Sequence, residues 1–134
     1  MEELHGIGHI CRLLNRWKER PENFLPETVG GVPGLSVFSQ AAGDPVKKRY
    51  IDGQCVCTLP FAVRYTVSGA VPAEKVDALG FFDRCTAYLR THAPTSDSFL
   101  CDAIRQVSVP AKTAVWADGT TEYTAQYAME YRTI

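Results

Sequence analysis

The chain has 134 residues, of which 46% are hydrophobic and 22% are charged, and its 14 lysines and arginines face 15 acidic residues for a net charge of −1. This composition excludes a disordered or fibrous protein and suits one globular domain, residues 1–134, whose core needs no metal or disulfide. The balanced charge argues against a protein whose main role is to bind phosphate backbones, because that role requires an excess of cations.

The sequence indicates a product made in the cytoplasm. It lacks the run of roughly 18 apolar residues that a membrane helix needs, and it lacks the cationic and apolar start of a secretory signal. An odd number of cysteines scattered among core-like neighbours is typical of reduced thiols. These are Cys11, Cys55, Cys57, Cys85 and Cys101. A particle that is assembled inside a cell also fits this description.

Residues 1–19 show the spacing of an amphipathic helix. Apolar side chains recur at steps of three and four, which places them on one face. The positions are Leu4, Ile7, Cys11 and Leu14, and the next step of three or four falls on Trp17 or Lys18. Pro21 ends the helix, and the prolines and glycines of residues 20–33 predict a connection rather than an element.

Residues 34–67 predict strands. A short one covers 34–39, and apolar residues at every second position from Cys55 to Val67 give the clearest strand pattern in the chain. Pro60 falls on the wetter face of this strand and offers no N–H to a ladder. We therefore expect the strand to lie at a sheet edge or to bulge at Pro60.

The pair Asp52-Gly53 separates two strand-like runs, a pattern that favours a tight hairpin. A two-residue turn would place Lys48 opposite Cys57, on the apolar face, where an unpaired ammonium is costly. Either a bulge shifts the register or the hairpin projects from the body of the protein.

A run of three cations before the turn favours projection, because these side chains need solvent or an acidic partner. We expect the hairpin to contact a neighbouring subunit, and a solvated surface hairpin is the alternative. The predicted contact residues are Lys47, Lys48, Arg49, Tyr50, Asp52 and Gly53.

Residues 73–92 predict the most regular helix. Pro72 precedes it, Glu74 lies in its first turn and an apolar stripe runs to Leu89. Strands are expected in residues 100–132, with Pro110 as an interruption and a turn before residue 121. The predicted fold class is α+β, a mainly antiparallel sheet with two main helices packed on one face.

The sequence offers little that resembles a catalytic or metal site. His5 and His9 stand four apart, the spacing of two metal ligands on a helix, but Gly6 and Gly8 weaken that helix. A zinc ribbon would need a second close pair of cysteines besides Cys55 and Cys57. We predict no catalytic residue, no metal and no cofactor, and therefore not an enzyme.

Tyrosines at alternating strand positions raise a third hypothesis, a single-strand nucleic-acid binder that uses them together with Arg64. The balanced charge argues against it, and tyrosines in such positions more often pack in the core or at its rim. The tyrosines are Tyr50, Tyr65, Tyr123, Tyr127 and Tyr131.

Four segments resemble one protein family. They are KRYIDG at 48–53, FAVRY at 61–65, LGFFD at 79–83 and YTAQYAMEY at 123–131. In this order they are similar to the minor capsid, or tail-terminator-like, proteins of tailed bacteriophages and of prophages of Gram-positive bacteria. The likeness spans about residues 30–133, and its motifs are structural rather than chemical.

The resemblance implies a non-enzymatic subunit of α+β architecture that caps the head-proximal end of a tail tube as a ring, commonly sixfold, and joins the tail to the head. Its implied partners are other copies of the chain, the major tail tube protein and the head–tail connector proteins, with DNA passing through the ring without specific binding. Its implied location is the virion, assembled in the bacterial host cytoplasm. The alternative function is a cytosolic small-molecule or metal-binding protein that uses His5, His9 and the thiols.

Overall fold

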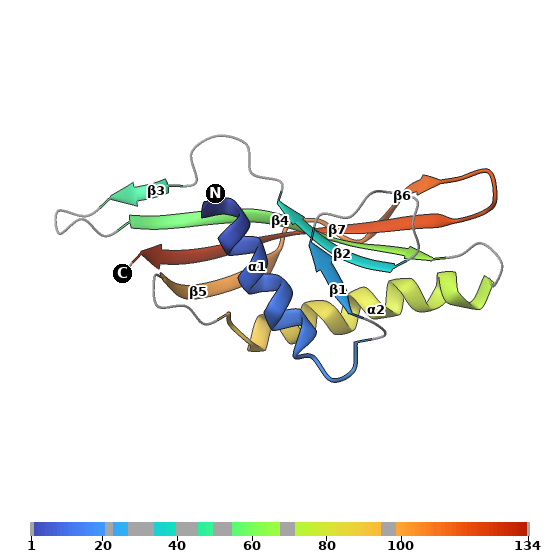
Figure 1. The fold of residues 1–134 in the computed structure, drawn as a ribbon, viewed down its shortest axis with the longest axis horizontal. Helices are drawn as coiled ribbons and strands as arrows, with labels where there is room; N and C mark the ends of the chain where they lie inside the picture. The colour runs from blue at the N-terminus through green and yellow to red at the C-terminus, as the bar shows by residue number, and fades with distance from the viewer. Residues whose placement is uncertain are drawn as a thin grey trace.

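A computed structural model describes residues 2–20, 23–26, 34–39, 46–49, 55–67, 72–94 and 99–133. The order of elements is helix, four strands, helix and three strands (Figure 1). Their bounds are α1 Glu2–Asn15, β1 Phe24–Pro26, β2 Gly34–Ser39, β3 Val46–Arg49, β4 Cys55–Val67, α2 Pro72–Thr91, β5 Phe99–Gln106, β6 Ala111–Val115 and β7 Thr121–Thr133.

Two strands of 13 residues, β4 and β7, form the centre of one seven-stranded sheet. They pair antiparallel from Val56 opposite Arg132 to Val67 opposite Thr121. The outer edge of β4 carries β3 and then β2, while the outer edge of β7 carries β5 and then β6. All these pairs are antiparallel as expected, and β1, parallel to β2, makes the sheet mixed.

Pro60 lies in a central strand whose ladder with β7 continues without a shift, so the expectation of an edge strand or a bulge at Pro60 was wrong. Pro60 stands opposite Ala128 of β7. On its other edge, β4 pairs with β3 through residues 55–57 and with β2 through residues 61–66. Within the described part of the chain, positions 58–60 therefore have no strand on that side. A proline is tolerated here because this is where one flanking strand ends and the next begins.

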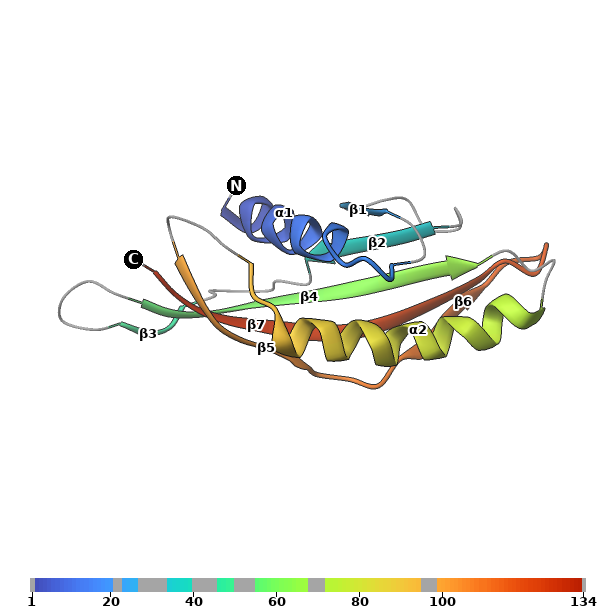
Figure 2. The same ribbon diagram turned by 90° about the horizontal axis from the view of Figure 1, so that it is seen from below.

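Both helices pack on the same face of the sheet, as predicted, because their apolar side chains belong to one buried cluster. Figure 2 shows α1 beside β1 and β2, and α2 running along β7 and β5. On β4 and β7 this face consists of the odd-numbered residues, such as Phe61 and Tyr127, whose rings stack 5.4 Å apart. The buried ring of Phe81, on α2, joins the layers. It contacts Trp17, which follows α1, at 5.7 Å and Tyr65 of β4 at 4.9 Å. One apolar core therefore connects both helices to the sheet.

The chain after α1 differs from the prediction. The helix ends at Asn15, although Trp17 beyond it is still buried. The Asn15 side chain makes two hydrogen bonds to the backbone of Phe24. Its Oδ1 accepts the Phe24 N–H at 2.7 Å, and its Nδ2 donates to the Phe24 carbonyl at 3.1 Å. These bonds attach β1 to the end of α1, and β1 pairs with β2 within a segment that had been expected to be only a connection.

The C-terminal strands agree with the prediction to within a few residues. The turn before β7 is closed by the Gly119 N–H, which donates to the Trp116 carbonyl at 2.9 Å. Gly119 has a φ of 89°, a conformation that a glycine adopts without strain. The carboxylate of Asp118 accepts the Thr120 N–H at 3.0 Å and so fixes the turn.

Candidate assembly surfaces

The predicted contact hairpin lies in part within the described residues. Lys47, Lys48 and Arg49 belong to β3, whereas Tyr50, Asp52 and Gly53 lie outside the described part of the chain. Figure 1 places β3 at one end of the long sheet, far from β6.

The register of this hairpin differs from that of a two-residue turn, and a shifted register was one of the two alternatives that the sequence left open. Arg49 is opposite Cys55, and Lys48 is opposite Val56 rather than Cys57. The pairs next to the turn are therefore already offset by one residue from the register of a two-residue turn. A further shift in the ladder between Val46 and Lys48 places Val46, not a lysine, opposite the buried Cys57. Within the described residues β3 pairs with β4 alone, which leaves its outer backbone edge open to another strand.

A second open edge runs along β5 and β6. Between these strands, the N–H groups of Val107 and Ser108 donate to the Gln126 carbonyl at 2.7 and 3.3 Å, so the contact with β7 extends two residues beyond the end of β5. Three valines on this edge are strongly exposed: Val107 at 54%, Val109 at 79% and Val115 at 59%. An exposed apolar edge strand is a template for pairing with another chain.

The sequence interpretation missed this valine edge. Its strands were predicted, but which strand is last in the sheet depends on pairing between distant segments. The available signal was Pro110 beside two valines, because proline within a strand-like run indicates an edge strand.

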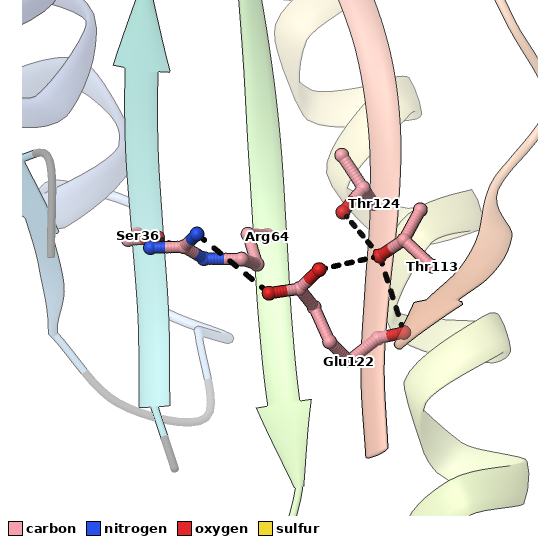
Figure 3. Close-up of polar contacts among 5 residues, drawn as sticks. All are labelled: Ser36, Arg64, Thr113, Glu122 and Thr124. Atoms are coloured by element: carbon pink, nitrogen blue, oxygen red, sulfur yellow. Dashed lines mark hydrogen bonds and ion pairs between the residues drawn. The ribbon is translucent and has the colours of Figure 1, made fainter. Parts of the chain in front are cut away.

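A polar network ties four strands together on the face opposite the helices (Figure 3). Arg64 of β4 donates from Nε to Ser36 Oγ of β2 at 3.2 Å, and its Nη1 lies 3.6 Å from Glu122 Oε1 of β7. Thr113 of β6 donates to Glu122 Oε2 at 2.6 Å and lies 3.0 Å from Thr124 Oγ1. The Arg64 and Glu122 side chains are only 15% and 14% exposed.

The Arg64 guanidinium is therefore engaged within the protein, and it also lies over the Phe38 ring at 5.1 Å. This occupation speaks against the hypothesis that Arg64 binds nucleic acid. The tyrosines of that hypothesis pack as expected: Tyr123 and Tyr127 are buried, and Tyr65 and Tyr131 pack against the core. Tyr50 lies outside the described residues.

The cysteines are largely buried, and burial favours the protonated form of three of them, Cys11, Cys85 and Cys101. Cys11, Cys55, Cys57 and Cys85 are buried, and Cys101 is partly buried. Burial raises the pKa of Cys85 to about 12 and also raises the pKa values of Cys11 and Cys101. A thiol becomes a nucleophile or a metal ligand only as a thiolate.

Of the two histidines in the metal hypothesis, only His9 has a described side chain. His9 lies 2.8 Å from Arg12 through its Nδ1 and contacts the Phe99 ring edge-on at 5.2 Å, and the side chain of His5 lies outside the described part. The described residues hold no group of three or more His, Cys, Asp or Glu side chains arranged to bind a metal ion.

No protein-family model matches the chain, and no curated protein matches it. None of the helices in the described residues has the length and apolar character needed to span a membrane. The class that the fold defines is an α+β domain with a mixed seven-stranded sheet and two helices on one face.

Proposed function

We propose that the protein is a structural subunit of a phage or prophage virion, a minor capsid or tail-terminator protein that assembles as a ring at the head-proximal end of the tail tube. The observation that carries the proposal is the valine edge, defined as β5, β6 and the residues between them, with Val107, Val109 and Val115 exposed. The family resemblance of residues 30–133 supports it further.

Two of the open edges in the described part of the sheet, those of β3 and of β5 and β6, are suited to forming a ring. The edge of β3 and the valine edge lie on opposite sides of one sheet. A contact between the edge of one copy and the opposite edge of the next is heterologous, and such contacts close into a ring when their rotation permits. The cations of β3 then supply a charged contact to the tube or the connector, and DNA passes through the ring without specific binding.

The test is the mass of the assembly. Light scattering and native mass spectrometry are performed on the purified chain, alone and mixed with a purified phage tail-tube subunit. We expect a ring, most simply a hexamer, with or without the tube. Val109→Lys places a charge on the apolar edge and should leave monomers, whereas Ala117→Lys in the exposed turn serves as the matched control.

A second variant tests the hairpin. Reversing the charges of Lys47, Lys48 and Arg49 should impair the joining of tails to heads without lowering the yield of folded protein. A chain that stays monomeric with the tube present, or a stoichiometric metal in protein purified without a histidine tag, would contradict the proposal and favour the small-molecule or metal-binding alternative.

A further inference from the structure

An open groove of about 760 Å³ lies between the end of α1 and the C-terminal half of α2. Its aromatic residues are Trp17, Tyr88 and His92. The Tyr88 hydroxyl donates to the Leu13 carbonyl at 2.7 Å and so fixes the distance between the two helices. This groove contains none of the residues used in the proposed function, and the inference does not depend on that function.

The cations around the groove are unusual for this protein. Among the residues whose side chains the structure describes, which excludes those of β3 and of the first turns of α2, five cationic side chains make neither a hydrogen bond nor an ion pair, and three of the five line the groove. The three are Arg16, Lys18 and Arg84, and the other two are Arg90 and Lys112. Glu19 is the single carboxylate in the lining, so the groove carries an excess of positive charge.

The aromatic rings are not free to stack on a nucleobase. Trp17 is buried, and the Tyr88 ring already stacks with Trp17 at 5.6 Å and with His92 at 4.1 Å. Binding of single-stranded nucleic acid needs accessible aromatic faces on which successive bases stack. The arrangement favours a ligand that brings carboxylates to the cations and an aliphatic side chain to the edge of Tyr88.

We propose that this groove docks an acidic peptide segment of a partner protein. Carboxylates of the segment pair with Arg16, Lys18 and Arg84, and an apolar side chain of the segment lies against Tyr88 and Ala87. Charge complementarity of this kind directs recognition and speeds association.

The test uses the full chain and a short fluorescein-labelled peptide in which Glu alternates with Leu. Fluorescence anisotropy of the labelled peptide measures its binding to the protein. We expect saturable binding that weakens as the salt concentration rises. Arg84→Glu should weaken binding about tenfold. The matched control is Arg90→Glu, the same charge change on the same helix outside the groove, which should weaken binding less than about twofold.

Lys18→Glu provides a second groove variant should Arg84→Glu fail to fold, and thermal unfolding checks the fold of each variant. Three outcomes would overturn the proposal. The first is that the peptide shows no saturable binding, and the second is that Arg84→Glu and Arg90→Glu weaken peptide binding equally. The third is that a labelled single-stranded oligonucleotide binds more tightly than the peptide and that Arg84→Glu abolishes this binding.

Discussion

The two faces of the sheet share the same strands but are held by different interactions. On the helix-covered face, the rings of Phe61, Tyr127 and Phe81 belong to one apolar core. On the opposite face, Arg64 and Glu122 link neighbouring strands through directed polar contacts. Apolar burial depends on area and tolerates small shifts, whereas a hydrogen bond depends on direction. We infer that the covered face supplies most of the stability and that the opposite face helps to select the strand register.

The largest effect should come from the covered face. Phe81→Ala removes a buried ring that contacts both the end of α1 and the sheet, and it should lower the free energy of unfolding by about 4 kcal/mol. Urea denaturation measures the loss. Asp83→Ala, an exposed change on the same helix, is the control and should cost less than about 0.5 kcal/mol. A loss at Phe81 no larger than the loss at Asp83 would refute the proposed role of this ring.

The second largest effect should be a fall in the free energy of unfolding at alkaline pH, caused by a thiol on the covered face. Burial raises the pKa of Cys85 from its usual 9.0 to about 12, so the folded protein keeps a proton that the unfolded chain releases. The stability due to this group is complete below pH 9 and declines as the pH rises from 9 to 12. Cys85→Ala should therefore flatten the decline in unfolding free energy over this range.

Tyr127→Phe serves as a companion measurement, because burial also raises the pKa of Tyr127. Cys101→Ala, at a less buried thiol, should change the slope less. If the unfolding free energy of Cys85→Ala declined with pH as steeply as that of the unaltered protein, this thiol would not be the cause of the loss of stability at alkaline pH.

The polar face should give the smallest losses. Arg64→Ala leaves the carboxylate of Glu122, which is little exposed, without its ion pair, and it should cost about 2 kcal/mol. Asp102→Ala breaks a pair with Arg132 whose side chains are 37% and 48% exposed, and it should cost less than about 0.5 kcal/mol. Chemical denaturation of both variants tests this order, and equal losses would mean that the polar network adds nothing beyond a surface ion pair.

The long elements were predictable because their patterns are local. The period-two pattern of β4 and β7 and the apolar stripe of α2, which includes Phe82 and Leu89, follow from burial on one side of a regular element. Strand β1 was not predictable, because three residues ending in Pro26 carry no periodicity. It depends on Asn15 and on pairing with β2, contacts that no local pattern encodes.

The candidate surfaces also combine features that a local pattern predicts with features that only the fold produces. The charge of β3 was visible in the sequence, but the register that places Arg49 opposite Cys55 is set by the sheet rather than by the Asp-Gly turn rule. The cationic groove was not visible, because it forms only where α1 and α2 meet. Arg16 and Arg84 are 68 positions apart in the sequence and come together only in the fold.

The central pairing of β4 with β7 has a consequence for the rate of folding. Even the paired residues closest in sequence, Val67 and Thr121, are 54 positions apart, and all of α2, β5 and β6 lies between them. Closing so large a loop costs chain entropy before the ladder returns any energy, which is characteristic of slow-folding β topologies. The chain should therefore refold on a time scale of milliseconds to seconds rather than microseconds.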